Sequence, residues 1–546
     1  MQSTTTDLTK GRPLSVIMRF ALPFMLSDFL QQLYNMVDSI IIGHALGEVS
    51  LAGIGVATPI MSIVINFLMG IAMGMGVVLS QYFGRGDIAS LKRVLSTGVM
   101  AGSAFTVALS AVCVALSKYF LLALATPIEA IGAADVYLKI IFAGGIFTFL
   151  YNYYMFSLRA VGNSLAPLII LIICVAINAG LDLVLILCTS MGIAGAAVAT
   201  VAAQAISVLL CAIYTRKRVR VLCLSRKDWV FDRKMLKVIT SYGLSVGLQQ
   251  VVIYAGRIAV QGLVNTYGTA VMGGVNNATR LDALLQTPLR GYTNALTNYY
   301  AQNWGAGYKD RIVRGYKESV AVSIINAVIF IALGYLLARP LSYIFIGSEG
   351  GQAVIDVCAD FLKAMVSGYF FVGAILIAQS LFKGVGKIGF FLTTTISSII
   401  FRVALSYIFD RFWGIKGMYW AVPASWLVAG TVGAILTVVT YRRHIRAMPQ
   451  LTSDAGERIL SVSKEESGLH KAVDGEGEQC SQLTSINTCI KTSIDTADIA
   501  DNGNYADLLG NAELTDDADV SGEAAETSDI TDNSAFRSDI SSGRDS

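Results

Sequence analysis

The stretch from Pro23 to Gly43, PFMLSDFLQQLYNMVDSIIIG, has the length and apolar content of a membrane span but carries several polar side chains. A carboxylate such as Asp28 or Asp38 costs at least about 2.5–3.5 kcal/mol at the centre of a bilayer. On a helix with about 100° per residue, Asp28, Gln31, Asn35 and Asp38 fall within a sector of about 80°. This polar stripe, about 15 Å long, predicts one wall of a cavity for an ion or a substrate. A structural hydrogen-bonded seam between helices, or the polar face of a soluble helix, is the alternative.

The composition of the whole chain supports the membrane interpretation. Of its 546 residues, 54% are hydrophobic and only 14% are charged, and the mean hydropathy is +0.60. These values predict an all-α polytopic membrane protein. The eight Cys form no CxxC pair and there are only three His, so we expect no metal or other cofactor beyond a transported ion. The motifs HExxH, GxSxG and Walker A are absent, so we expect neither an enzyme nor an ATP-driven pump.

Twelve apolar spans predict twelve transmembrane helices, with boundaries good to a few residues. Lys and Arg gather at the N-terminus and after every second span, and the positive-inside rule therefore places both termini in the cytoplasm. We expect a multi-pass protein of the cell membrane, either an inner or a plasma membrane. The spans run at about 14–42, 50–80, 93–117, 130–157, 164–187, 193–214, 238–266, 274–302, 312–338, 353–382, 388–412 and 416–442.

The two halves of the chain repeat three motifs at nearly one spacing. The segment beginning at Gln81 (QYFGRGD) matches that at Gln302 (QNWGAGYKD), Leu158 (LRAVGN) matches Leu381 (LFKGVGK), and GIAGA at residues 192–196 matches GIKGM at 414–418. The offsets are 221, 223 and 222. This repeat predicts two six-helix lobes related by a pseudo-twofold axis along the membrane normal, with a cavity between them. The expected parts are a cytoplasmic N-terminus (1–13), an N-lobe (14–214), a basic cytoplasmic linker (215–237), a C-lobe (238–442) and an acidic, disordered cytoplasmic tail (443–546).

A second group of polar residues lies in spans 5 and 6. Asn178 and Asp182 are four residues apart and therefore share one helical face, and Thr200 adds an oxygen on span 6. Together with Asp38 they supply oxygen ligands suited to Na⁺, and carboxylates suited to H⁺. Two carboxylates in a poorly hydrated pocket repel each other, which favours uptake of a proton or a cation. A packing role, in which Asp182 bonds to Asn178 and nearby backbone, is the alternative.

These motifs, taken in order, resemble the MATE (multidrug and toxic compound extrusion) transporters over about residues 12–445, and most closely the prokaryotic DinF/MepA-like branch. The resemblance rests on five segments: 34–43 (YNMVDSIIIG), 81–87 (QYFGRGD), 158–163 (LRAVGN), 178–182 (NAGLD) and 192–204. It implies a two-lobe antiporter that uses alternating access to export organic, often cationic, compounds in exchange for H⁺ or Na⁺.

The resemblance also implies roles for single residues. Asp38 falls on the ion-coupling acid of the family, and Asn178, Asp182 and Thr200 fall on the rest of its N-lobe coupling-ion site, which also serves as the possible Na⁺ site. Positions 222 residues beyond Asp38 and Asp182 hold Val260 and Ala404, so the second half lacks both counterparts. We therefore expect one ion site, in the N-lobe. The same oxygen ligands serve H⁺ and Na⁺, so both coupling ions stay open.

A substrate cavity is expected from polar, aromatic and Met side chains, each of which has ordinary packing as its alternative. We expect Asp282 to form an ion pair with a neighbouring Arg, and Arg402 to cap carbonyls or pair with an acid. The same is expected of Arg257, although an Arg257 that faces the cavity would favour anionic substrates. The candidates are Asp28, Gln31, Tyr34, Asn35, Met36, Tyr151, Tyr154, Gln204, Gln250, Tyr254, Arg257, Gln261, Asp282 and Tyr292.

The partners expected are small organic molecules and the lipid bilayer, without nucleic acid, and we expect a monomer. The alternative function is a flippase or exporter of lipid-linked or polysaccharide intermediates from the same superfamily. That alternative predicts a more cationic central cavity and often additional helices. The twelve spans and the anionic stripe of span 1 favour the drug exporter.

Overall fold

The computed structural model describes residues 6–123, 126, 128–189, 191–346 and 351–448. Side chains are not described at 33–54, 129, 187 and 344–346, although these positions lie in helices. The chain divides into two units, 1–461 and 462–546, and everything below concerns the first. Most of the acidic tail expected at 443–546 and the side chain of Asp38 therefore lie outside the described residues.

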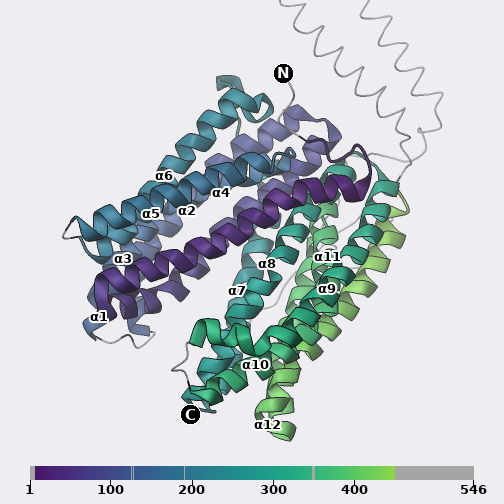
Figure 1. Ribbon diagram of the computed structural model, residues 1–546. Coiled ribbons are helices and arrows are strands. Elements are labelled where there is room, and N and C mark those ends of the chain that lie inside the picture. The colour runs from purple at the N-terminus through teal and green to yellow at the C-terminus, as the bar shows by residue number, and fades with distance from the viewer. Residues whose placement is uncertain (1–5, 124–125, 127, 190, 347–350, 449–546) are drawn as a thin grey trace, which may run out of the picture. The chain divides into compact units, whose positions relative to one another are not determined.

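The first half of the chain forms helices that gather together in Figure 1, coloured purple to blue. Gly55–Arg85, the second apolar stretch of α1, packs against the second half. Between Arg218 and Arg233, where the flanking helices end and begin, the chain forms two short 3₁₀ turns, Arg220–Leu222 and Arg226–Asp228, so those helices extend into both ends of the linker expected at 215–237. The helices are α1 (Pro13–Arg85), α2 (Ile88–Ala123), α3 (Ile128–Ala143), α4 (Gly145–Ala160), α5 (Leu165–Leu187) and α6 (Ile193–Arg218).

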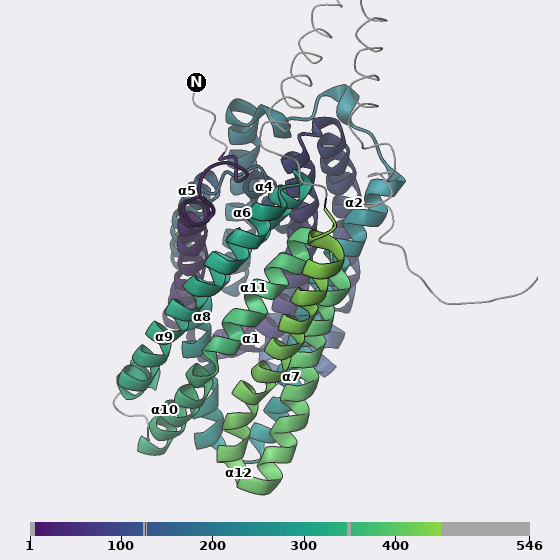
Figure 2. The ribbon, with the colours of Figure 1, turned by 90° about the vertical axis from the view of Figure 1, so that its right-hand side faces the viewer.

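The second half repeats this arrangement, with its helices in teal to yellow-green in Figures 1 and 2. A short π-helical turn, Tyr441–Ile445, follows the last helix. The helices are α7 (Arg233–Asn265), α8 (Thr269–Gly305), α9 (Lys309–Ile346), α10 (Gln352–Ser367), α11 (Tyr369–Val385) and α12 (Ile388–Thr440).

The twelve expected spans do not correspond one to one with the observed helices. The described residues contain eight helices long and apolar enough to cross a membrane, or ten when each of two bent pairs counts as one span. The expected spans 11 and 12 are joined in α12, where Gly414 breaks the helical backbone. The expected span 8 is α8, which is too polar to pass as a span by composition. The twelve-helix, two-lobe prediction is thereby confirmed.

The repeat predicted from the sequence is visible in the backbone. The fourth span of each half is bent at a glycine, by 47° between α3 and α4 and by 53° between α10 and α11. Gly192 (φ 54°, ψ −127°) and Gly414 (φ 60°, ψ −149°) stand 222 residues apart and adopt the same conformation, which side chains with a Cβ avoid. The two halves therefore share bends and breaks as well as motifs.

The repeated motifs meet each other where the two halves touch. A Cβ on Gly84 would lie 2.0 Å from the backbone oxygen of Gln302, and one on Gly305 would lie 1.9 Å from that of Gln81. Gln81 Nε2 donates to the carbonyl of Gly384 at 2.8 Å, and Gln302 Nε2 donates to that of Ala160, also at 2.8 Å. We call Gln81, Gly84, Gln302 and Gly305 the interlobe latch. Each half holds the other through the same two residues.

The N-terminal segment is fixed at the same end of the molecule. Leu8 is fully buried, and its backbone N–H donates to Gln302 Oε1 at 3.1 Å. The guanidinium group of Arg311 donates to the carbonyls of Leu8 and Gly11. Residues 8–11 thus contact the C-half side of the interlobe latch, whereas the backbone N–H of Thr6 donates to the carbonyl of Gly162 in the N-half at 3.1 Å.

Candidate functional site

A cavity of about 860 Å³ lies between the two halves. Its lining comes from α1 on one side and from α7, α8, α10, α11 and α12 on the other, so the C-half contributes most of it. Five of the residues that the sequence analysis proposed line this cavity: Asp28, Gln250, Arg257, Gln261 and Asp282.

The cavity carries an excess of positive charge. Among the described residues, two carboxylates line it, Asp28 and Asp282, against five basic side chains, which leaves an excess of three positive charges in this part of the lining. Lys383 is buried, with its ammonium 5.4 Å from the centre of the Phe391 ring. The basic residues are Arg257, Arg280, Arg290, Lys383 and Arg402.

A ladder of side chains on α8 connects an acid to an arginine. Gln286 Nε2 donates to Asp282 Oδ2 at 2.8 Å, and Arg290 Nη2 donates to Gln286 Oε1 at 3.0 Å. The other carboxylate oxygen of Asp282 accepts the hydroxyl of Tyr369 at 2.9 Å. The direct ion pair expected for Asp282 is therefore not formed, because the four-residue spacing inserts Gln286 between the charges and neutral donors occupy both carboxylate oxygens.

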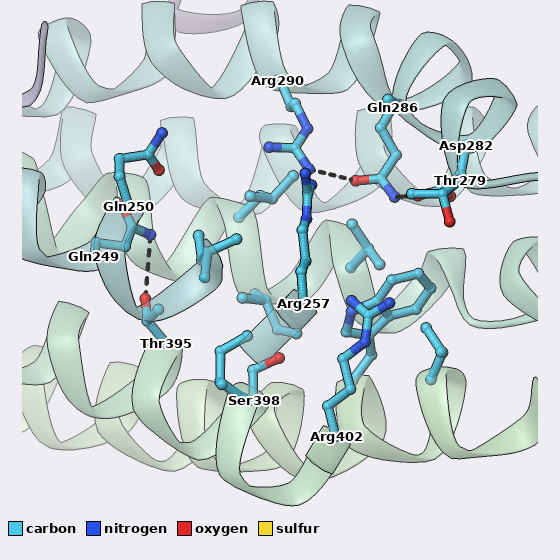
Figure 3. A pocket seen from close by; sticks show the side chains of 18 of the residues that line it. Gln249, Gln250, Arg257, Thr279, Asp282, Gln286, Arg290, Thr395, Ser398 and Arg402 are labelled. Atoms are coloured by element: carbon cyan, nitrogen blue, oxygen red, sulfur yellow. Dashed lines mark hydrogen bonds between the residues drawn. The ribbon is translucent and has the colours of Figure 1, made fainter. Parts of the chain in front are cut away.

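Three arginines from three helices converge beside this ladder. Figure 3 shows Arg257 of α7, Arg290 of α8 and Arg402 of α12 reaching into the same space. Arg257 lies close enough to interact electrostatically with both of the others, and its guanidinium carbon is 5.6 Å from the centre of the Tyr254 ring. Within the described part of the chain, Arg402 Nε is buried without a hydrogen-bond partner. The expectation that Arg257 and Arg402 cap carbonyls or pair with acids is wrong for the described residues, since neither forms such a bond there.

Asp28 lies on α1, on the N-half side of the cavity. Its carboxylate interacts with the side-chain amide of Asn294 and lies near the guanidinium groups of Arg159 and Arg290. Arg159 is buried, with its guanidinium carbon 3.8 Å from the centre of the Phe24 ring. Asp28 is thus surrounded by basic groups, which compete with any cationic ligand for its charge.

Amides and hydroxyls complete the polar lining. Gln249 Nε2 donates to Thr395 Oγ1 at 3.1 Å (Figure 3). Gln379 Nε2 donates to the same oxygen, also at 3.1 Å. Gln250 Nε2 reaches Asn66 Oδ1 at 3.4 Å across the boundary between the halves. These neutral groups offer hydrogen bonds and add no charge to the cavity.

The candidate coupling-ion residues of the N-half lie apart from this cavity. Asn178 and Asp182 on α5 are 2% and 1% exposed. A Cβ on Gly195 would lie 2.9 Å from Leu185 O, and Cys174 Sγ lies 3.9 Å from Ala203 O, so α5 and α6 run antiparallel with Asn178 level with Thr200. Thr200 Oγ1 donates to Ala196 O at 3.1 Å. The structure therefore brings three of the four proposed residues to one pair of helices, while the Asp38 side chain lies outside the description.

The other proposed substrate residues are placed as follows. Tyr292 is buried and donates to Ser319 Oγ, and Gln204 accepts from Thr148. Tyr151 and Tyr154 pack against a buried cluster around Met155. Gln31 is half-buried on α1, and Tyr254 reaches Asn66. The side chains of Tyr34, Asn35 and Met36 lie outside the described residues.

Several lining residues were not proposed from the sequence as parts of the cavity. Gln286 and Arg290 could have been found from their spacing, since they follow Asp282 at steps of four on one helical face. Arg402 and Lys383 carry the signal of a basic residue in or at the edge of an apolar span. Arg159 carries the same signal but lies beneath Asp28.

The comparisons with known proteins agree with this architecture. The family model MatE matches twice, at residues 23–184 and 246–408, once in each half. A probable multidrug resistance protein, YpnP of Bacillus subtilis, is 29% identical over 77% of this chain and 94% of its own length. The multidrug export protein MepA of Staphylococcus haemolyticus is 22% identical over 77% and 92%.

A solved structure from Pyrococcus furiosus has the same fold. It covers 83% of this chain and 99% of its own, with a TM-score of 0.77 and 22% identity. It is described as a transporter of the MOP superfamily in which the reverse polarity of the binding pocket suggests a different function.

Proposed function

We propose, from the premise that this chain belongs to the MATE family of transporters, that it exports small organic compounds by antiport with H⁺ or Na⁺. The observation that carries the coupling part is the burial of Asp182 and Asn178 on α5, level with Thr200 on α6. A buried carboxylate changes the local charge when it gains or loses a small cation, and helix packing responds to that change. Relatives named as multidrug resistance proteins support the export of organic compounds.

The position of the contact between the halves supports alternating access as the transport cycle. The positive-inside rule places the interlobe latch at the cytoplasmic face, because Lys10, Arg85 and Arg311 lie at that end. In this proposal, the formed latch closes the cavity toward the cytoplasm. Ion binding at the N-half site would change the packing of α1, α5 and α6 and thereby bias the latch between formed and broken states.

The cationic cavity is the feature that the alternative function predicts. Export of lipid-linked or polysaccharide intermediates would use such a cavity, whereas the twelve-span architecture and the named relatives support the exporter of small compounds. We therefore retain the export of small organic compounds as the proposed function.

The test is export of a panel of fluorescent organic dyes from proteoliposomes against Na⁺ and proton gradients imposed separately. We expect one of the two gradients to drive export, and Asp182→Asn and Asp38→Asn to remove the gradient dependence. Undiminished gradient-driven export by both variants would contradict the proposed coupling site. Export unaffected by either gradient would contradict antiport.

A further inference from the structure

The cluster formed by Arg257, Arg290 and Arg402, which we call the arginine cluster, forms no direct ion pair among the residues whose side chains the structure describes. Asp282 interacts electrostatically with Arg290 and Arg402, but both of its oxygens accept hydrogen bonds from neutral donors, Gln286 and Tyr369. Within the described ranges, none of the three arginines lies within 4.0 Å of a carboxylate oxygen in an ion pair. Guanidinium groups gathered at membrane depth repel one another strongly, because the surrounding dielectric constant is low.

The donors of the arginine cluster are directed at the cavity. Arg290 uses one nitrogen on Gln286, which fixes its orientation and leaves its other N–H groups free for a ligand. Arg402 Nε is buried and without a hydrogen-bond partner in the described chain, and a buried, unsatisfied charged donor is costly. Arg257 is exposed to the cavity (Figure 3). Planar forks of this kind bind carboxylate and phosphate oxygens in pairs, which a lysine cannot do.

The rest of the cavity wall is apolar next to the arginine cluster. Large apolar side chains from α10, α11 and α12 supply it, so a ligand that fills the volume is amphiphilic. These are Phe361, Met365, Leu376, Met418, Val422 and Trp426.

We propose that the arginine cluster is the substrate head-group site, and that the transported compounds are amphiphilic anions with an apolar body and a carboxylate or phosphate group. The inference rests on the proposed export function and names its substrate class. Amphiphilic anions thus take the place of the cationic compounds that the sequence analysis expected. The acid of span 1 that lines the cavity, Asp28, already interacts with Asn294, Arg159 and Arg290.

The test is equilibrium binding of two dyes of similar shape and opposite charge to the purified full-length protein, measured by fluorescence anisotropy. Carboxyfluorescein is the anionic probe and rhodamine 123 the cationic one. We expect carboxyfluorescein to bind more tightly, and Arg257→Gln and Arg402→Gln each to weaken it by about tenfold, with rhodamine 123 changed by less than about twofold. Arg290→Lys, which keeps the charge but removes the planar fork, is expected to weaken it as well.

The control is Arg339→Gln, which removes an arginine paired with Asp356 at 2.7 Å on the exposed surface of α9. It is expected to leave the binding of both dyes unchanged. If Arg290→Lys fails to fold, the cavity-exposed Arg257 still decides the question. Competition with octanoate, octyl phosphate and octyltrimethylammonium separates a carboxylate from a phosphate and both from a cation.

Two results would overturn the inference and leave the proposed export function intact. One is tighter binding of rhodamine 123 than of carboxyfluorescein, and the other is an unchanged affinity for carboxyfluorescein in both glutamine variants. Anion binding that depends on the arginines, without export of any dye from proteoliposomes, would instead contradict the proposed function and keep the site.

Discussion

The two halves of this transporter share a backbone but carry opposite polar chemistry. Gly192 and Gly414 take the same conformation, and Gln81 and Gln302 make equivalent hydrogen bonds across the boundary. Yet the N-half buries Asn178 and Asp182, whereas the same stretch of the C-half holds Arg402 and no acid. The difference teaches that a repeated backbone can carry different side-chain chemistry in its two copies, and it supports our proposal of an ion site in one half and a ligand site in the other.

The largest expected effect tests the N-half side of this comparison. Asp182→Asn should reduce gradient-driven export by about 100-fold, because the buried group can no longer change its charge. Dye export from proteoliposomes under an imposed gradient measures it. Asp356→Asn, a carboxylate on the exposed end of α10, is the matched control and should export normally. Equal export by both variants would remove the distinction between the halves.

Substitutions in the interlobe latch should destabilise the structure to a similar extent in the two halves. Gly84→Ala and Gly305→Ala should each destabilise the structure by about 1–3 kcal/mol, because the new Cβ would approach a backbone oxygen to 2.0 and 1.9 Å. Thermal unfolding in detergent gives the two shifts. Gly389→Ala, with no atom within 4 Å of its Cβ, is the control. A large shift in only one of the two variants would show that the latch is symmetric in shape but not in energy.

The helix starts at Gly192 and Gly414 allow a smaller test of the same likeness. An alanine at either position must adopt a conformation with positive φ and ψ beyond −120°, which should cost about 1–3 kcal/mol. Gly262→Ala lies in a regular helix with open space around it and should cost less. Unfolding followed by circular dichroism ranks the three. A result in which Gly262→Ala is the most destabilising would contradict the conformational argument.

The linker between the halves is not part of the repeat. The loss of its ion pair is expected to have the smallest effect on stability of the changes considered. The Lys92 ammonium, 2.9 Å from Asp228, together with the hydroxyl and backbone N–H of Ser225, lowers the pKa of Asp228 to about 2. A lowered pKa stabilises the fold at pH values above the ordinary value near 4. Solvent screens this surface ion pair, so the contribution is at most about 1 kcal/mol, and it disappears as the pH falls through about 2.

Asp228→Asn should therefore loosen the linker at pH 7 but not at pH 2. The fluorescence of the adjacent Trp229 during thermal unfolding reports this local change. Identical curves for the variant and the parent at pH 7 would show that the ion pair contributes nothing.

The hydropathy pattern predicts most of the architecture, because the length and order of apolar spans determine how a chain crosses a bilayer. It does not identify α8, which is too polar to pass as a span by composition and whose C-terminal end carries one of the repeated motifs. The repeated motifs at Gln81 and Gln302 were recognised from their letters, but their contact with each other was not, since a sequence match says nothing about distance. The bends between α3 and α4 and between α10 and α11 were missed as well. A bend at a glycine inside an apolar run leaves the hydropathy unchanged.

The cavity was only partly predictable. Asp282 and Arg257 were proposed, but charged residues within spans were interpreted as pairs, and the four-residue spacing of Asp282, Gln286 and Arg290 was not used. The convergence of Arg257 with Arg402 depends on the packing of α7 against α12. Separation in the chain hides such a contact, so no local pattern reveals it.

The central claim is that the N-half couples the ion and the C-half binds an anionic ligand. The most direct measurement is the dissociation constant of carboxyfluorescein, with and without the coupling ion, for Asp182→Asn and Arg402→Gln side by side. Our account predicts that Asp182→Asn binds the dye normally but no longer responds to the ion, whereas Arg402→Gln binds it about tenfold more weakly and still responds. The reverse pattern, or the same defect in both variants, would contradict the division of roles.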